Sequence, residues 1–225
     1  MTVDQDARAN ARNDQAAATR RQLLDGARVV FEASGYRAAT VAAITDRADT
    51  AHGTFYLYFR NKEDAFCQVI EAVIVDELST IPFILSDHAP RAALEHGIRN
   101  FVAAYHRRDG LWRALLEGML QSPRVQRLWL DLRRDLVVRL SRTFDAQQRA
   151  GTVRSFDSTM VAHALAAMTE WSAFTHLVLG EPRPDADDDP EALVATLTDL
   201  WYRSVYGTVT EPAGAGPAAQ TEPSA

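Results

Sequence analysis

A short segment near residue 55 gathers side chains that suit contact with nucleic acid. Residues 51–59 read AHGTFYLYF. If this segment is a helix, Phe55 and Phe59 lie four residues apart and can face a core, which leaves Tyr56 and Tyr58 toward the other side. Thr54 lies on that other side as well. Hydroxyl groups and aromatic rings suit phosphates, base edges and thymine methyl groups.

Three neighbouring residues fit the same chemistry. His52 stands at the exposed start of the segment and offers an imidazole. Gly53 has no side chain, so DNA can approach its backbone closely. Lys62 begins the next helix, where its charge and the free amide groups can share a phosphate. The alternative interpretation is a plain helical bundle that carries surface aromatics.

The apolar periodicity predicts the helices that position these side chains. A helix of about fifteen residues ends at Ser34-Gly35, and two short helices follow, joined at Asp49-Thr50. That arrangement is typical of a helix-turn-helix, whose second helix enters a major groove. Almost every later segment also has helical spacing. We therefore expect an all-α protein of about nine helices, with an N-terminal helix-turn-helix three-helix bundle and a C-terminal helical domain.

The composition excludes a disordered tail protein, a collagen-like fibre and a disulfide-linked scaffold. Of 225 residues, 47% are hydrophobic and 24% charged, as in ordinary soluble globular proteins. Cys67 is the single cysteine, so no internal disulfide is expected. The sequence has no long apolar run and no secretory leader, so we expect a cytoplasmic location without membrane contact. The net charge is −6, yet residues 15–62 carry a surplus of three positive charges, which favours contact with phosphates.

The segments LLDGARVVFEASGY, AATVAAITDRA and above all GTFYLYFRNKEDAF resemble the DNA-binding region of the tetracycline-repressor (TetR, AcrR-type) family of bacterial transcription regulators. The last segment follows the family pattern Gly-Thr-aromatic-Tyr-x-Tyr-Phe-x-x-Lys-Glu. The resemblance implies a homodimer that binds a double-stranded DNA operator with one recognition helix per subunit. It implies DNA-contact roles for Thr40, Thr50, His52, Thr54, Tyr56, Tyr58 and Lys62.

Three departures from the family pattern affect the recognition helix. Asp49 stands where the turn usually has glycine, and aspartate tolerates a left-handed backbone better than most residues. Ala51 stands where serine usually caps the helix, so either Thr50 caps it or the helix loses about 1 kcal/mol. Thr45 replaces a usual alanine on the packing face of the preceding helix.

The resemblance also implies a pocket for an unidentified small-molecule effector after residue 85 and dimerisation through the last two long helices. Any one aromatic of the C-terminal domain could equally be a core residue, because pockets and cores use the same residue types. The expected ligand-binding residues are Phe101, Tyr105, Trp112, Met119, Trp129, Met168 and Trp171. The expected dimer residues, on helices with surplus apolar area, are Phe174, Leu193, Leu197, Leu200 and Trp201.

Motifs for catalysis, metals and cofactors are missing. The spacing Asp185-x-Asp187-x-Asp189 resembles a calcium loop, but Pro190 and Thr196 stand where that loop needs glycine and glutamate. The sequence has no zinc-ligand pairs, nucleophile elbow or phosphate-binding glycine loop. We expect no metal, no cofactor and no enzyme activity, and we expect Cys67 to be a buried thiol.

The predicted organisation is a disordered arm (1–16), a helix-turn-helix domain (17–62), a ligand-binding and dimerisation domain (63–208) and a disordered tail (209–225). The predicted function is a repressor, dimeric on a palindromic operator and released by a small apolar or aromatic effector. The helix from residue 62 to 78 joins the two domains and is the hypothesised carrier of the signal. Two alternatives stay open: a DNA-binding regulator without an inducer, and an all-α carrier or enzyme with a vestigial helix-turn-helix.

Overall fold

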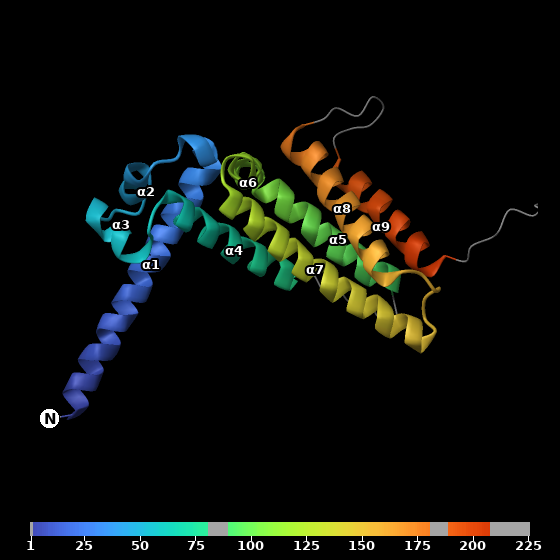
Figure 1. Cartoon of the computed structure of the whole chain (residues 1–225), viewed down its shortest axis with the longest axis horizontal. Helices are drawn as coiled ribbons and strands as arrows, with labels where there is room; N and C mark the ends of the chain where they lie inside the picture. Colours follow the sequence, from blue (N-terminus) through green and yellow to red (C-terminus); the bar gives the residue numbers. More distant parts are fainter. Residues whose placement is uncertain (1, 81–89, 181–188, 208–225) are drawn as a thin grey trace, which may run out of the picture.

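The computed structural model of the chain is a set of helices joined by short connections (Figure 1). It describes residues 2–80, 90–180 and 189–207, with side chains described for residues 13–74 and for all of the other two ranges. These residues form nine α-helices and one π-helical turn and contain no strand, which confirms the predicted all-α class. The elements are α1 (Thr2–Ala38), α2 (Val41–Arg47), α3 (His52–Tyr58), α4 (Lys62–Thr80), α5 (Pro90–Arg107), α6 (Asp109–Gln121), α7 (Pro123–Ala150), α8 (Ser158–Ala173), η1 (Phe174–Val178) and α9 (Pro190–Tyr206).

The first helix, α1, is longer than the apolar periodicity predicts. It begins at Thr2, so the predicted disordered arm is helical, and Figure 1 shows it projecting from the rest of the molecule. The arm has four alanines, which favour helix, and it contains no glycine or proline to stop one. At the other end Gly35 has φ 76° and ψ 175°, so the helix is interrupted at the predicted place.

Helix α2 packs against the second half of α1, and α3 packs against α2, which completes the predicted three-helix bundle (Figure 1). Phe31 of α1, Ile44 of α2 and Phe55 of α3 are completely buried, and Phe59 is nearly so. The pair Phe55 and Phe59 therefore faces the core, as their spacing predicted. This anchoring determines which face of α3 remains outside.

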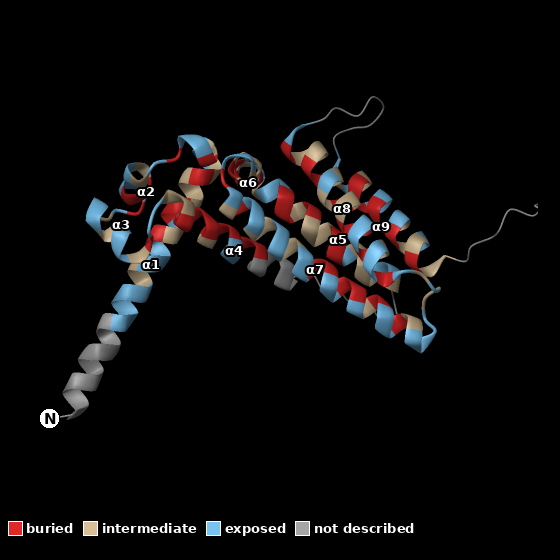
Figure 2. Ribbon diagram, in the orientation of Figure 1, coloured by how far each residue is buried: buried red, intermediate tan, exposed pale blue. Residues whose placement is uncertain are grey.

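The core of this bundle continues into the C-terminal helices. Phe66 of α4 lies edge-on against Phe31, with ring centroids 4.6 Å apart, and 4.8 Å from the ring of Tyr36. Phe66, Trp112 and Ala173 belong to the same buried cluster as Ile44. Figure 2 shows buried residues running from the bundle along α4 to α6. The predicted domain boundary after residue 62 therefore falls within a hydrophobic core that both predicted domains share.

A second core lies between α5, α7, α8 and α9. Phe144 of α7 is completely buried there, and Leu197 of α9 is 2% exposed. Trp201 joins the same cluster, and its indole Nε1 donates to Thr169 Oγ1 at 2.7 Å. This core fixes α9 against its own chain.

Most of the predicted dimer residues are used within one chain, which corrects that part of the prediction. Leu193, Leu197 and Trp201 follow each other at intervals of four residues, so they form one stripe, and that stripe packs on the second core. Phe174 is buried in the first core. Leu200 lies off the stripe and is 44% exposed, so among the five it alone remains available to a partner.

No helix among the described residues is both long and apolar enough to cross a membrane. The predicted tail, 209–225, and the aspartates Asp185 and Asp187 lie outside the described residues. Asp189 is described, and it serves as the N-cap of α9 by accepting from the Glu191 N–H at 2.9 Å.

Candidate functional site

The turn before α3 forms as the sequence predicted. Thr40 caps α2, because its Oγ1 accepts from the Ala43 N–H at 3.1 Å. Asp49 has φ 48°, the left-handed conformation that the family pattern usually gives to glycine. Thr45 is 2% exposed, and its hydroxyl donates to the carbonyls of Val41 and Ala42, so the helix itself satisfies the buried oxygen.

The start of α3 lacks a side-chain cap. Ala51 occupies the N-cap position and makes no capping hydrogen bond from its side chain. Thr50 does not replace it, since its buried Oγ1 has no hydrogen-bond partner in the part of the chain that the structure describes. The free amide groups at this end of α3 are therefore open to another acceptor.

The outer face of α3 consists of His52, Gly53, Tyr56 and Leu57, which recur at the helical interval of four residues. His52 lies edge-on to Tyr56, with ring centroids 5.6 Å apart. Tyr56 is 54% exposed and Leu57 is 80% exposed. Apart from its chain neighbours and the backbone of its own helix, no described heavy atom would lie within 4 Å of a Cβ at Gly53, so the backbone there is open. We call these four residues the α3 face.

Two of the predicted contact residues lie beside this face rather than on it. Thr54 and Tyr58 are half-buried, toward the flank that meets the rest of the bundle. Leu57 is the residue that the sequence reasoning missed. Its position four residues after the open Gly53 could have indicated it, because an apolar side chain that points away from the core needs another explanation.

Lys62 has internal partners in addition to any external one. Its Nζ donates to the carbonyls of Tyr36 at 2.8 Å and Arg37 at 3.1 Å, and it lies 5.0 Å from the centre of the Tyr36 ring. Burial lowers the pKa of this ammonium, although the Glu117 carboxylate partly opposes the shift. Lys62 thus ties the start of α4 to the end of α1. Its third N–H is left for another acceptor, and its role as a phosphate contact stays a prediction.

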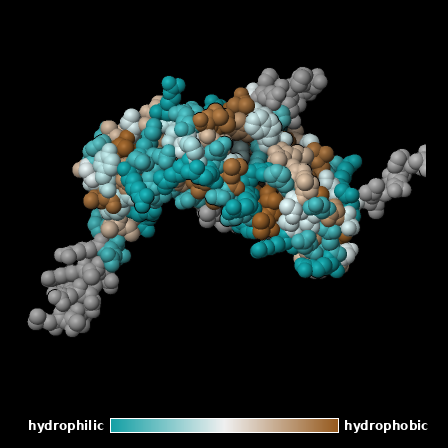
Figure 3. Space-filling model, viewed as in Figure 1, coloured by the Kyte–Doolittle hydropathy of each residue, from teal (hydrophilic) through white to brown (hydrophobic). Residues whose placement is uncertain are grey.

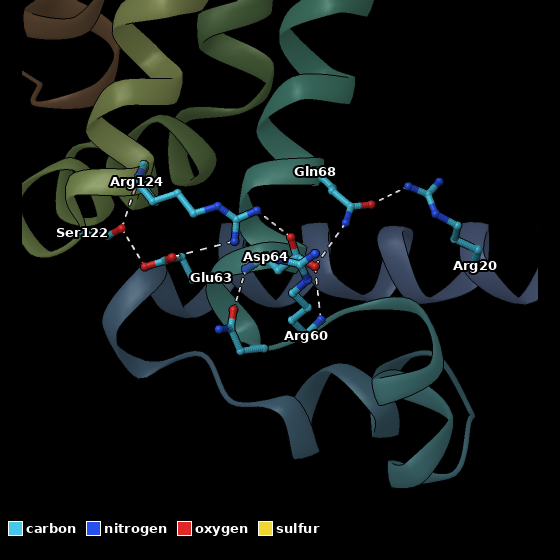
Figure 4. A network of polar contacts seen from close by, with 9 residues as sticks. Arg20, Arg60, Glu63, Asp64, Gln68, Ser122 and Arg124 are labelled. Carbon is cyan, nitrogen blue, oxygen red and sulfur yellow. Dashed lines mark hydrogen bonds and ion pairs between the residues drawn. The ribbon is translucent and has the colours of Figure 1, made fainter.

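A polar network joins the bundle to the C-terminal helices (Figure 4). Arg124 of α7 donates to Asp64 Oδ1 at 2.6 Å. The second oxygen of Asp64 accepts from the Arg60 N–H at 3.1 Å. Ser122, the N-cap of α7, donates to Glu63 at 2.7 Å. We call this set, at the start of α4, the α4–α7 clamp.

Helix α6 presses directly on α1. A Cβ at Gly110 would lie 2.1 Å from the carbonyl oxygen of Glu32, so the two backbones touch. Glu117 accepts from the Arg37 N–H at 3.1 Å, and its carboxylate lies against Gly35. A shift of α6 must therefore displace the end of α1, to which Lys62 is also tied.

An open cleft of about 350 Å³ lies between α5, α6, α7 and α8. A much smaller space of about 30 Å³ adjoins it, shares five of its lining residues and reaches α4 through Ile74. Figure 3 shows apolar residues in several separate patches on an otherwise largely hydrophilic face. The predicted ligand residues that line one space or both are Phe101, Tyr105, Trp112, Met119, Trp129 and Trp171.

Met168 is the exception among the predicted ligand residues. It packs against the second core rather than the cleft. Ala167, its neighbour on α8, lines the cleft instead, because successive residues of a helix point about 100° apart. Phe174, predicted for the dimer, also lines the cleft and stacks on Trp171, with ring centroids 5.6 Å apart.

The cleft contains a buried ion pair that the sequence did not reveal. Arg133 Nε donates to Glu170 Oε2 at 2.7 Å, and both side chains are 14% exposed. The guanidinium also contacts His163 Nδ1 at 2.9 Å. Burial raises the pKa of Glu170, while Arg133 opposes the rise. The two residues lie on different helices, 37 positions apart in the sequence, so no local spacing predicted the pair.

Cys67 is buried, as predicted. Burial is the main cause that raises the pKa of its thiol to about 11, and the nearby Arg124 opposes the rise. The thiol therefore stays protonated near neutral pH, which does not suit a redox switch.

Two family descriptions match the chain. Residues 23–67 match the "Bacterial regulatory proteins, tetR family". Residues 94–207, about half of the chain, match the "Transcriptional regulator EthR, C-terminal domain".

Individual relatives agree with these matches. The chain is 25% identical over 193 residues to the HTH-type transcriptional regulator EthR of Mycolicibacterium smegmatis, covering 83% of this chain and 86% of that protein. It is 27% identical over 194 residues to the HTH-type transcriptional repressor Rv1474c of Mycobacterium tuberculosis, covering 85% and 95%. The solved structure of SmeT, the repressor of the Stenotrophomonas maltophilia multidrug efflux pump SmeDEF, superposes with a TM-score of 0.65 at 22% identity and covers 87% of this chain and 97% of that one. The likeness to SmeT establishes a shared fold.

Proposed function

The chain belongs to the TetR family of bacterial transcription regulators, and from that premise we propose that it is a homodimeric repressor, released from its operator when a small molecule occupies the cleft. It is a transcriptional regulator with a DNA-binding domain, and its relatives are regulators rather than enzymes. The repressor role, the dimer, the symmetric operator and the effector are the proposed parts.

One observation carries the proposal for DNA: the α3 face is exposed while the opposite side of α3 is fully buried. A short helix held rigidly by Phe55 and Phe59 can enter a major groove without moving relative to its bundle. His52 supplies hydrogen-bonding groups for base edges or phosphates, and Tyr56 a hydroxyl for a phosphate. Leu57 supplies an apolar contact for a thymine methyl group.

The proposed dimer uses the outer faces of α8 and α9, which lie side by side in Figure 1. Met160 and Trp171 of α8 are 64% and 63% exposed, and Leu200 of α9 is 44% exposed. Exposed apolar side chains of this size favour burial against a second copy. In that dimer two α3 faces would meet successive major grooves, about 34–36 Å apart.

The proposed signal passes from the cleft through α6 as well as α4. Trp112 lines the cleft on α6, and the same helix touches the backbone of α1 at Gly110. A molecule that binds better to a conformer with displaced α6 would shift the dimer toward a spacing that no longer fits the operator. The shift is limited to the difference in affinity between the two conformers.

The first test is binding of the purified protein to DNA upstream of its own gene, measured by fluorescence anisotropy across a salt series, with random-sequence DNA as control. The proposal predicts tighter binding to the specific DNA, two subunits per site and a steep loss of affinity with salt. A regulator without an inducer would bind in the same way but keep its affinity in the presence of every cleft ligand. A carrier or enzyme with a vestigial bundle would show no salt-dependent binding to either DNA.

If the upstream DNA binds no better than random DNA, variants separate a wrong operator from a lost function. Tyr56→Ala should weaken the residual binding to random DNA at low salt, because it removes a phosphate contact. Asp131→Asn, on the far α7, is the matched control and should leave that binding unchanged. Identical binding by both variants and the unaltered chain would contradict the proposed role of the α3 face.

A further inference from the structure

The two charged side chains that line the cleft neutralise each other. This step rests on the proposed role of the cleft as an effector site. Arg133 and Glu170 neutralise each other at 2.7 Å, and both are largely removed from water. His163 contacts this guanidinium but is itself exposed and does not line the cleft, so Arg133 and Glu170 are the charged residues of the lining. A charged ligand would therefore enter without a free counter-charge, which is costly wherever its charge loses contact with water.

One residue that lines the cleft has a hydrogen-bond donor without a partner. Trp112 is 8% exposed and lines both parts of the cleft. Its buried Nε1–H has no partner among the described residues, and an indole N–H can only donate. A buried donor without an acceptor weakens the free state, so a ligand that brings an acceptor gains that energy back. Trp201 is the contrast, since its Nε1–H already bonds Thr169.

The walls of the cleft suit flat rings. Trp112 stacks on Tyr105 with centroids 4.1 Å apart and planes inclined by 5°, and Trp129 meets Trp112 edge-on at 6.3 Å. Trp171 and Phe174, which also line the cleft, stack on each other. Such walls favour offset or edge contacts with further aromatic rings. The volume of about 350 Å³ lies near the lower end for ligand pockets, so it suits a small ligand.

We propose that the effector is an uncharged, largely aromatic small molecule with a carbonyl or similar acceptor, and that the indole N–H of Trp112 donates to that acceptor. The aromatic surface provides most of the affinity. The acceptor and the absence of charge provide the selectivity. Arg133 and Glu170 keep the site neutral rather than bind a charged group.

The test uses four probes that share one ring system and differ only in the group attached to it. They are 2-acetylnaphthalene, which is neutral with an acceptor; 2-ethylnaphthalene, neutral without one; 2-naphthoate, an anion; and 2-(aminomethyl)naphthalene, a cation. Calorimetric titration of the full-length protein should rank acetyl first, about tenfold over ethyl, with the two ions weaker than either. In a spectrum of ¹⁵N-labelled indoles, the Trp112 resonance should move with the acetyl probe and much less with the ethyl probe.

Two variants identify the donor. Trp112→Phe keeps a ring but removes the N–H, so it should abolish the preference for acetyl over ethyl while both probes still bind. Trp201→Phe is the matched control outside the cleft, and it should keep the preference. Folding of each variant is checked by its thermal midpoint. Because the readout is a ratio between two probes on the same protein, a general weakening of the fold would not mimic the result.

The outcomes separate this inference from the proposed function. Equal affinity for the acetyl and ethyl probes, or tightest binding of an ion, would overturn the ligand class while leaving a ligand-binding cleft in place. Absence of binding by all four probes would also overturn it. The DNA experiment needs no ligand, so specific DNA binding would still support a regulator in either case.

Discussion

Arg124 and Asp64 bond across the junction of the two halves of the molecule. The guanidinium at the start of α7 donates to the carboxylate at the start of α4 at 2.6 Å, and Figure 4 shows the bond extended through Gln68 to Arg20 of α1. Asp64 is 12% exposed and Arg124 is 43% exposed, so the pair is only half shielded from water. The DNA-binding bundle is therefore tied to the C-terminal helices at the base of the helix that joins them.

Replacement of Asp64 should loosen this junction. Asp64→Asn keeps the shape but removes the charge that accepts from Arg124, the Arg60 N–H and Gln68. We expect a loss of about 1.5–3 kcal/mol in the free energy of unfolding, the usual range for hydrogen bonds to a charged group. Urea unfolding measures it. Asp131→Asn, in an exposed pair with Arg134, is the matched control and should change the free energy by less than about 0.5 kcal/mol.

The same carboxylate predicts a dependence on pH. Burial alone would raise the pKa of Asp64, but hydrogen bonds from Arg124, Arg60 and Gln68 hold it below its ordinary value. A pKa that is lower in the folded state gives stability that is fully present above the unfolded value, about 4, and is lost as the pH falls through the folded value. The difference in unfolding free energy between the unaltered protein and Asp64→Asn should thus be constant from pH 7 to 5 and shrink below pH 4. A difference that stays constant down to pH 3 would contradict this account.

Much of the fold could be predicted because its determinants are local. The stop at Gly35, the left-handed Asp49 and the pair Phe55 and Phe59 depend on residue type and on spacings within one helix or turn. The all-α class and the helix-turn-helix follow from the same local patterns. The helical arm, 2–16, was missed because polar residues carry no apolar periodicity, whereas propensity alone supports the helix.

What could not be predicted depends on contacts between distant parts of the chain. The apolar stripe of α9 fits a dimer interface or the core of its own chain equally well. Only the packing shows that Leu197 and Trp201 are buried in the core of their own chain. The pair Arg133 and Glu170 joins two helices, and each residue alone resembles an ordinary surface charge. Lys62 looked free for DNA because nothing local shows that it reaches the carbonyls of Tyr36.

Leu57 gives a direct test of the α3 face. Leu57→Ala should leave stability within about 0.5 kcal/mol, because the side chain is 80% exposed. Binding to operator DNA should weaken by about 1 kcal/mol or more, the lower end for one base contact. Replacing operator thymines one at a time by uracil, which lacks the methyl group, should locate the contacted base. At that base the unaltered protein should lose affinity, whereas Leu57→Ala should not; equal losses for both proteins at every thymine would remove Leu57 from base recognition.

Two glycines should separate the structural junction from the DNA face. At Gly110 an added Cβ would lie 2.1 Å from the Glu32 carbonyl oxygen, so Gly110→Ala must push α6 away from α1. Overpacking of this kind costs about 1–3 kcal/mol and should lower the thermal midpoint.

Gly53→Ala makes the same chemical change where nothing lies within 4 Å. It should leave the midpoint unchanged or raise it, since alanine favours helix over glycine by up to about 1 kcal/mol. Its cost should appear only in DNA affinity, because the new methyl group stands on the α3 face between His52 and Leu57. Thermal melts and anisotropy titrations on both variants check the contrast. Normal operator affinity in Gly53→Ala would mean that the DNA does not approach this part of α3 closely, and the recognition surface would then have to be centred on Tyr56 instead.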